Sequence, residues 1–446
     1  MKAKSEYNEY IKVQLELKPI KRDRISPLDR PAEERIKDFK EVNLGFTEIE
    51  AMLEAERCLD CKNPTCIKGC PVNIDIPGFI VALREGEINK SYDIITKSHA
   101  FPCITGRVCP QERQCEEVCI LQNKNKPVNI GKLERYVGDH ARIEKTHSNS
   151  FTHSVGIVGS GPSSMALAAD LLKHDIKPVI YEAFDKTGGV LTYGIPSFRL
   201  PREVTSGEID NLIERGLEIN KGIIVGKSIS IDELLVLHDF VFVGSGAGLP
   251  KLMGIKGEEG NNVLTANEFL TRVNLLNAGD KEYLTPMPIG KSVAVIGGGN
   301  VAMDAARVAI RLYDRVDLFY RRNEENMSAR IEEIAHAKEE GVVFHFGLSP
   351  MEIKDDNIIF KKGEIEESFS ADIVVVAIGT EPNKLMDFSK EGISTKDGLI
   401  VVDDNLKTTK DRVYAGGDVV TGAATVIEAY GAGKRAAKSI IEELKK

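Results

Sequence analysis

Long apolar runs, basic blocks and dispersed cysteines are all absent from this 446-residue sequence. No apolar stretch approaches the roughly 20 residues that a membrane-spanning helix needs, and the charged residues 1–40 lack the apolar core of a signal peptide. The net charge of −9, without a basic block, argues against nucleic acid or an anionic membrane as a partner. We therefore expect a cytoplasmic protein of about three domains, with ordinary globular proportions of 42% hydrophobic and 28% charged residues.

Cysteine occurs only between residues 58 and 119, where all eight copies form two groups. The groups are Cys58-x2-Cys61-x4-Cys66-x3-Cys70-Pro71 and Cys103-x5-Cys109-Pro110-x4-Cys115-x3-Cys119. In a reducing compartment, clustered cysteines indicate metal binding rather than disulfides. Thiolates bind iron strongly, four ligands hold one cubane cluster, and a cysteine before proline, such as Cys70, commonly ligates a second cluster. Iron–sulfur clusters are favoured, with four-cysteine zinc sites or buried structural thiols as the alternatives.

A first glycine-rich turn, residues 155–164 (VGIVGSGPSS), has the pattern of strand, tight turn and helix start. Gly159 permits the turn, and Gly161 lets a pyrophosphate approach the backbone at the helix N-terminus. Ser164 replaces the usual third glycine or alanine and is small enough to keep the helix close to the sheet. Glu182 lies 23 residues after Gly159, at the end of the next strand, where it can accept the ribose hydroxyls. This context predicts a dinucleotide site rather than a chance glycine turn.

A second turn of the same layout, Gly297-Gly298-Gly299-Asn300, follows the apolar residues 293–296. The next expected strand ends at Arg321 and Arg322. An acidic residue there would select NAD, whereas two arginines suit the 2′-phosphate of NADP. NADP is therefore expected over NAD, unless the guanidinium groups are merely solvated at a strand end. Two such units, with strands alternating with helices, predict doubly wound parallel sheets.

Five segments together carry a resemblance to one family. They are Cys58–Ile80, Gly106–Cys119, Tyr193–Pro201, Tyr320–Arg330 and Tyr414–Arg435. On these segments, which span roughly residues 40–440, the chain resembles the small (beta) subunit of NADPH-dependent glutamate synthase. It is also similar to the large subunit of the NADH-dependent reduced ferredoxin:NADP oxidoreductase, and the N-terminal half of dihydropyrimidine dehydrogenase belongs to the same group.

The resemblance implies an α/β fold of the glutathione-reductase-like FAD/NAD(P) type behind a helical domain that holds two 4Fe-4S clusters. We expect the helical iron–sulfur domain over residues 1–150 and the NAD(P)H-binding domain over residues 289–384. The FAD-binding domain is then split into residues 151–288 and 385–446. Residues 243–248 and 377–383 resemble the two crossovers between the units.

The resemblance also assigns ligands to the two clusters. One cluster is expected to bind Cys58, Cys61, Cys66 and Cys119, and the other Cys70, Cys109 and Cys115. The fourth ligand of the second cluster is an oxygen donor in this family, and Glu134 occupies its place. Cys103 is left over, either as a replacement for Glu134 or as a spare thiol, and Glu134 is favoured.

FAD is implied at the first turn and NAD(P)H at the second. Asp418 is expected beside the ribityl chain and pyrophosphate of FAD, with a helix cap as the alternative role, and the helix over residues 425–441 would direct its N-terminus at the flavin. The full set of expected cofactor-binding residues is Gly159, Gly161, Pro162, Ser163, Glu182, Gly189, Arg199, Gly246, Gly297, Gly299, Asn300, Val301, Arg321, Arg322, Gly379, Gly417, Asp418, Ala424 and Thr425.

The implied reaction is hydride transfer from NADPH to FAD, followed by single-electron transfer through the clusters. No catalytic acid–base pair is expected, and His99, His336 and His345 are interpreted as surface or core residues. One candidate function is the electron-input subunit of a glutamate synthase. The alternative is the large subunit of an electron-bifurcating ferredoxin:NADP oxidoreductase, or a sulfide dehydrogenase-type relative, and a structural zinc module is a third interpretation. The expected partner is accordingly a glutamate synthase large subunit or a small flavoprotein subunit, with ferredoxin and a second copy of the chain as further candidates.

Overall fold

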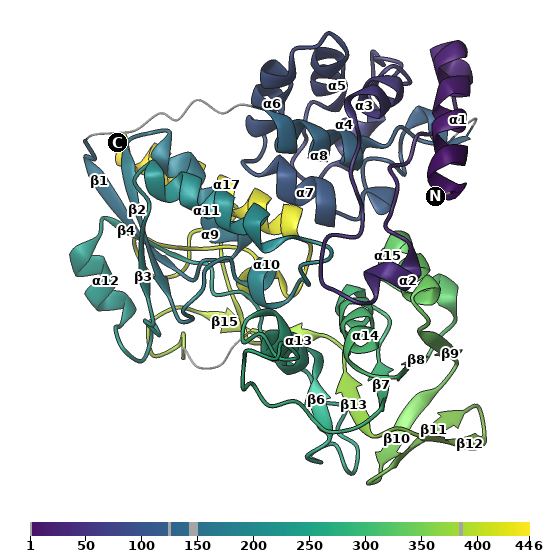
Figure 1. Cartoon of the computed structure of the whole chain (residues 1–446). Helices are drawn as coiled ribbons and strands as arrows, with labels where there is room; N and C mark the ends of the chain where they lie inside the picture. The colour runs from purple at the N-terminus through teal and green to yellow at the C-terminus, as the bar shows by residue number, and fades with distance from the viewer. Residues whose placement is uncertain (1, 124–125, 142–149, 383–386) are drawn as a thin grey trace.

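The computed structural model describes residues 2–123, 126–141, 150–382 and 387–446, and it contains three bodies (Figure 1). A helical body lies at the top of the view, a first sheet at the left and a second sheet at the lower right. None of the described helices is long and apolar enough to cross a membrane.

The N-terminal body is built from short helices. They are α1 (Lys2–Glu16), η1 (Pro19–Lys21), α2 (Ala32–Arg35), α3 (Glu48–Ala55), α4 (Thr65–Gly69), α5 (Ile76–Arg84), α6 (Ile88–Thr96), α7 (Pro102–Val108), η2 (Gln111–Arg113), η3 (Ile120–Asn123) and α8 (Ile130–His140). Phe79, Leu83 and Leu133 are fully buried in its core. A Cβ atom on Gly106 of α7 would lie 2.5 Å from the backbone nitrogen of Arg135 on α8, so glycine allows these two helices to touch. That contact brings the second cysteine group against α8.

The first sheet is parallel, with the order β17-β4-β1-β2-β3. Its strands are β1 (His153–Val158), β2 (Ile176–Glu182), β3 (Glu218–Lys221), β4 (Phe240–Val243) and β17 (Val413–Ala415). The accompanying helices are α9 (Pro162–Leu172), α10 (Val190–Tyr193), α11 (Arg202–Glu214), α12 (Ile231–Leu237), α16 (Asp418–Thr421) and α17 (Val426–Leu444). Because β17 pairs with β4, the chain returns to this unit after it has built the second one.

The second sheet is also parallel, with the order β6-β13-β7-β8-β9. Its strands are β6 (Val263–Thr265), β7 (Ser292–Ile296), β8 (Arg315–Tyr320), β9 (Val343–Phe346) and β13 (Ile373–Val376). Its helices are α13 (Ala266–Asn274), α14 (Asn300–Leu312), η4 (Glu324–Asn326) and α15 (Ile331–Glu339). An antiparallel sheet of β10 (Ser349–Ile353), β11 (Asn357–Lys362) and β12 (Ile365–Ser370) joins this unit. The predicted pair of parallel α/β units behind a helical domain is confirmed.

Two short strands connect the α/β units. They are β5 (Leu249–Pro250) and β14 (Thr380–Glu381), which pair antiparallel, and the Lys251 amide donates to the Gly379 carbonyl at 3.0 Å. The two expected crossovers therefore lie side by side, although residue 383 and the expected boundary at residue 384 fall outside the described residues. A small ribbon, β15 (Thr395–Lys396) with β16 (Leu399–Ile400), follows on the way back to β17.

The helical body meets the two α/β units in different ways. Phe101, Ile104 and Cys109 share one hydrophobic cluster with the first sheet and α17, where the Phe101 and Tyr430 rings lie 5.2 Å apart. We call this contact the apolar interface. Toward the second unit, Phe39 and Val42 join an apolar cluster, but charged side chains predominate. We call this charged set, which Arg199 of the first α/β unit joins, the ionic junction. It comprises Asp29, Arg35, Lys132, Arg199, Asp304, Arg330, Glu332, Glu333, His336 and Glu340.

Candidate functional site

Three thiols and one carboxylate line a buried cavity beneath α8 and α17. The four side chains are Cys70, Cys109, Cys115 and Glu134. All three cysteines are buried and in the free thiol form. Burial raises the pKa of the Cys109 and Cys115 thiols well above the ordinary range. Thiols concentrated in an apolar pocket are suited to a metal centre, because a bound cation favours the thiolate form that ligates it.

Four further cysteines line a second cavity, which we call the outer cavity. They are Cys58, Cys61, Cys66 and Cys119, and each is partly exposed. Burial, followed by the neighbouring Cys58 and Cys119, raises the pKa of Cys66 to about 12. Each cavity is therefore lined by the four side chains that the resemblance assigned to one cluster.

The spread of the sulfur atoms bears on which metal would fit. A tetrahedral zinc ion with Zn–S distances of 2.3 Å needs sulfur atoms about 3.8 Å apart. Across the described part of the chain, Asp29, Glu332 and His336 are the one group of three ligand side chains whose atoms all lie within 4.8 Å of one another. The cysteine sulfurs of both cavities are thus spaced more widely than a single zinc ion requires. The donor set, seven thiols and one carboxylate, fits iron–sulfur clusters.

Cys103 lies outside both cavities. Its Sγ atom donates a hydrogen bond to Oε1 of Glu208 on α11, at 2.8 Å. Glu134, and not Cys103, contributes to the lining of the buried cavity. The spare-thiol interpretation of Cys103 agrees with this placement.

The first glycine turn leaves space where a pyrophosphate is expected. Gly159 has φ = +84°, and a Cβ atom there would lie 2.9 Å from the Gly244 carbonyl oxygen. A Cβ atom on Gly161 would meet nothing within 4 Å, so the space before α9 is open. Pro162 and Ser163 are the first two residues of α9. Gly189 packs against Gly161, because a Cβ atom added to Gly189 would lie only 2.8 Å from the Gly161 Cα atom.

Glu182 is held at the end of β2 beside this turn. Its Oε2 accepts hydrogen bonds from the Ser160 amide (2.8 Å) and hydroxyl (2.5 Å), and its Oε1 accepts from the Phe184 amide (2.9 Å). The carboxylate therefore shapes the turn, whatever part it has in ribose binding.

The returning segment reaches the same end of the sheet. A Cβ atom on Gly417 would lie 2.9 Å from the Ser163 hydroxyl, so Asp418 follows directly beside the start of α9. Oδ1 of Asp418 accepts from the Ala424 amide at 3.3 Å, and burial raises the pKa of Asp418 to about 6. Thr425 then caps α17 in a capping box with Glu428. Gly246 and Gly379 both have positive φ with open space around them, in the two connections between the units.

The second glycine turn stands before α14. Gly297 has φ = +152°, and a Cβ atom added to it would lie only 2.3 Å from the Ala377 carbonyl oxygen. Gly299 has more space, since the nearest atom to an added Cβ is the Ser328 hydroxyl oxygen at 3.4 Å. Asn300 begins α14 and accepts the Arg330 amide through Oδ1 at 2.9 Å, and Val301 next to it is partly exposed.

Arg321 and Arg322 follow β8 and are both exposed. In the described ranges neither guanidinium has an ion pair with a carboxylate. Two uncommitted cations at this strand end are suited to a 2′-phosphate.

Arg199 occupies a position that the sequence did not indicate. It was expected among the cofactor-binding residues, but its buried guanidinium pairs with Asp304 of α14 at 2.7 Å and lies 3.2 Å from Glu333 of α15. The side chain thus links the first α/β unit to the second.

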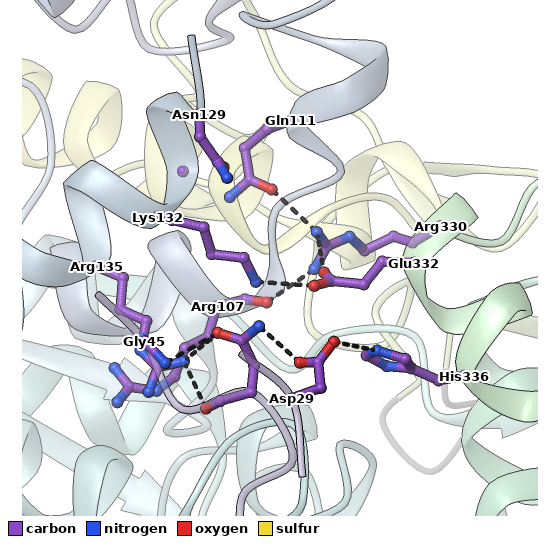
Figure 2. A network of polar contacts seen from close by, with 12 residues as sticks. Asp29, Gly45, Arg107, Gln111, Asn129, Lys132, Arg135, Arg330, Glu332 and His336 are labelled. Atoms are coloured by element: carbon purple, nitrogen blue, oxygen red, sulfur yellow. Dashed lines mark hydrogen bonds and ion pairs between the residues drawn. The ribbon is translucent and has the colours of Figure 1, made fainter. Parts of the chain in front are cut away.

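The ionic junction is the largest feature that sequence reasoning missed (Figure 2). Arg330 donates to the Arg107 carbonyl (2.8 Å) and to Oε1 of Gln111 (3.2 Å), both in the helical body. Lys132 of α8 pairs with Glu332 at 2.9 Å. Arg330 is the last residue of the segment Tyr320–Arg330 that carries part of the family resemblance. Membership of that segment was the only sign in the sequence analysis that Arg330 has a special role.

Comparisons with known proteins show which families the two parts of the chain match. Residues 35–146 match the family described as dihydropyrimidine dehydrogenase domain II, 4Fe-4S cluster, and residues 153–433 match the pyridine nucleotide-disulphide oxidoreductase family. The NADPH-dependent glutamate synthase small chain of Azospirillum brasilense is 33% identical over 449 residues, covering 93% of each chain. The beta subunit of the NADP(+)-dependent formate dehydrogenase of Moorella thermoacetica is 34% identical over 433 residues, covering 85% of this chain and 60% of that one.

Among solved structures, Mycobacterium tuberculosis FprA in complex with NADPH superimposes with a TM-score of 0.54 at 18% identity. The match covers 66% of this chain and 85% of that one, and it concerns the fold alone.

Proposed function

Because this chain belongs to the family of the NADPH-dependent glutamate synthase small chains, we propose that it is the electron-input subunit of a larger complex. It is an oxidoreductase that uses NADPH, FAD and 4Fe-4S clusters. Bound FAD accepts a hydride and releases electrons singly, which is the chemistry that connects a nicotinamide to iron–sulfur clusters. The chain's own residues bind the cofactors, bring them close together and exclude water from the space between them.

One observation carries the proposal, and it is the order of the two cavities. The buried cavity lies next to α17 of the flavin unit, and the outer cavity lies beside it, closer to solvent. Ile427, in the first turn of α17, lines the buried cavity, and Thr425 caps the same helix. We propose that the flavin binds at this helix start. Ile76 and Ile130 line both cavities. We infer that electrons enter the buried cavity from the α17 side and leave through the outer cavity.

Each binding role follows from local charge. The N-terminus of α9 directs unpaired amides at the pyrophosphate of FAD, and α17 presents the positive end of its dipole to the flavin. Arg321 and Arg322 bind the 2′-phosphate of NADPH by charge-assisted hydrogen bonds. Glu182 accepts from the FAD ribose while it holds the Ser160 turn.

The partner subunit is proposed to dock at the outer cavity. Leu59 and Ile120 line this cavity and are 46% and 49% exposed, so an apolar rim surrounds the cysteines that are closest to solvent. The family favours a glutamate synthase large subunit at this surface. We place the complex in the cytoplasm, where the seven proposed cysteine ligands stay reduced until they bind iron.

A ferredoxin-linked or other oxidoreductase complex is the second candidate. The Moorella thermoacetica relative favours it, because that protein's name joins the same kind of chain to a formate dehydrogenase. The identity of the subunit that co-purifies with the native protein separates the two: a glutamate synthase large chain supports the first and a different redox subunit the second.

The test is an anaerobic NADPH titration of the purified chain, followed by visible spectroscopy and EPR. Flavin bleaching followed by signals of reduced clusters is the expected result. Purified protein without iron and acid-labile sulfide would overturn the proposal. The double variant Arg321→Ala/Arg322→Ala should raise the KM for NADPH by about 10- to 100-fold, since hydrogen bonds to charged groups contribute about 1.5–3 kcal/mol, with the KM for NADH little changed. Arg315→Ala, at the opposite end of β8, is the matched control.

A further inference from the structure

The carboxylate of Glu134 is held by one of its two oxygens. Oε1 accepts a hydrogen bond from the Thr105 hydroxyl at 2.5 Å and lies 3.0 Å from Nε2 of His99. His99, Thr105 and Glu134 are all buried. Within the described residues no side chain or backbone group bonds the other oxygen, and Glu134 lines the buried cavity beside three cysteines. A carboxylate anchored in this way presents one free oxygen in a defined direction.

The hydrogen bonds around His99 determine which ring nitrogen carries the proton. The Phe101 amide donates to Nδ1 of His99 at 3.2 Å, so Nδ1 of the neutral ring is the acceptor. Nε2 therefore carries the hydrogen and donates it to Glu134. The ring also lies parallel to Tyr430 of α17, at an angle of 5° and 6.3 Å between centroids. His99 is thus fixed from the flavin side as well as from its own loop.

We propose that His99 and Thr105 are positioning residues for the buried cluster: they hold Oε1 of Glu134 so that Oε2 serves as the fourth ligand. The inference rests on the proposed function, which places a cluster in this cavity. Hydrogen-bond donors on a ligating carboxylate fix its orientation and draw charge from it. Reduction adds negative charge to a cluster, so such donors favour the reduced form and raise the reduction potential.

The outer cavity supplies an internal reference. Its four proposed ligands are all cysteines, and neither His99 nor Thr105 lines it. Loss of the two donors should therefore change one cluster and leave the other as it was. A general loss of stability would have no reason to discriminate between the clusters.

Four substitutions separate positioning from simple structural support. Thr105→Val removes the hydroxyl at constant shape, and Thr105→Ser retains it. His99→Phe keeps an aromatic ring against Tyr430 but removes the N–H donor, whereas His99→Gln keeps an amide donor. Ser91→Ala is the matched control, because the buried Ser91 hydroxyl donates to the Phe79 carbonyl at 2.8 Å in the same domain without contacting Glu134.

The experiment is an EPR-monitored redox titration of each full-length, anaerobically purified variant, with iron and sulfide analysis on the same samples. Thr105→Val and His99→Phe should each lower the midpoint potential of one cluster. The ratio of oxidised to reduced cluster at a fixed potential should rise about tenfold, which corresponds to 59 mV for one electron. The g-values of that cluster should also change. Thr105→Ser, His99→Gln and Ser91→Ala should stay near the wild type. The Thr105→Val shift should vanish when Glu134→Ser is already present.

The outcomes that overturn the inference are distinct from failure of the proposed function. Two intact clusters with unchanged potentials in Thr105→Val and His99→Phe would contradict it, as would equal shifts in both clusters or the same shift in Ser91→Ala. Loss of the buried cluster alone in Thr105→Val, with retention in Thr105→Ser and Ser91→Ala, supports it. Wild-type protein without any iron–sulfur cluster would contradict the proposed function itself.

Discussion

The helical body contacts the first α/β unit mainly through apolar side chains, whereas buried charges predominate where it and Arg199 of the first unit meet the second unit. At the apolar interface, Phe101 and Tyr430 belong to the same cluster as the first sheet. At the ionic junction, Arg35, which is 1% exposed, pairs with Glu340 at 2.7 Å. Apolar burial stabilises without direction, whereas a buried ion pair contributes little net stability but penalises any arrangement that leaves a charge unpaired. We infer that the apolar interface joins flavin and cluster domains tightly, and that the ionic junction sets the orientation of the NADPH unit.

The largest expected effect comes from breaking the ionic junction on one side only. Arg199→Met leaves the buried Asp304 without its 2.7 Å partner, which should lower the free energy of unfolding by about 3–5 kcal/mol. The double variant Arg199→Met/Asp304→Leu removes both charges and should recover most of the loss. Urea unfolding midpoints of the anaerobic proteins provide the measurement. A single variant that unfolds like the wild type would show that orientation does not depend on this pair.

A pH-dependent effect is expected at Glu208, which accepts a hydrogen bond from Cys103 at the apolar interface. Burial raises the pKa of Glu208 to about 7, against an ordinary 4.5, with Cys103 as its hydrogen-bond donor. Because the pKa of Glu208 is higher in the folded state than in the unfolded state, Glu208 contributes to the free energy of unfolding in full below pH 4.5. This contribution is lost as the pH rises through 7. Glu208→Gln should therefore gain stability over the wild type across this window, by up to about 3 kcal/mol. The check is thermal unfolding from pH 5 to 8, with Glu203→Gln on the exposed face of α11 as the control.

A smaller gain in stability is expected when the hydroxyl of Tyr430 is removed. This atom is buried and has no hydrogen-bond partner in the described part of the chain. Tyr430→Phe should raise the free energy of unfolding by about 1 kcal/mol, because an unsatisfied polar group is removed from the apolar interface. Tyr414→Phe is the matched control and should destabilise by a similar amount, since the Tyr414 hydroxyl donates to Glu443 at 2.5 Å. Equal signs for the two variants would refute the assignment.

The smallest effect is expected at the solvent-exposed margin of the ionic junction. Asp29 lies 3.1 Å from Nε2 of His336, and its side chain is one-third exposed. Exposed pairs of this kind contribute about 1 kcal/mol or less. Asp29→Asn should therefore unfold within about 1 kcal/mol of the wild type in urea, and a loss comparable to that of Arg199→Met would show that the margin is as important as the buried part.

Sequence patterns were sufficient wherever the chemistry is local. A buried strand, a glycine turn and a helix start are contiguous, so Gly159 and Gly297 predicted both α/β units, and the fold class is confirmed. The cysteine spacing predicted iron–sulfur clusters, which the family match supports. The assignment of Glu134 depended on the family resemblance, since nothing in its neighbourhood of the sequence indicates a ligand.

Long-range partners explain what could not be read from the sequence. Arg199 resembles a cofactor-binding residue in its motif, but its partner Asp304 lies 105 positions away. Arg330 donates to a carbonyl 223 positions away. Hydrogen bonds and ion pairs act only over a few ångströms, so separations of this size are resolved by folding alone.

The amino-acid sequence by itself predicted the two cysteine groups, the two glycine turns and the cations that follow β8, because each rests on residues near one another in the chain. The tertiary structure decided which cysteines share a cavity, which oxygen of Glu134 is free and which surfaces join the three bodies. Those features depend on side chains that meet only when α7, α8 and α17 pack together, and burial of their shared apolar surface drives that packing.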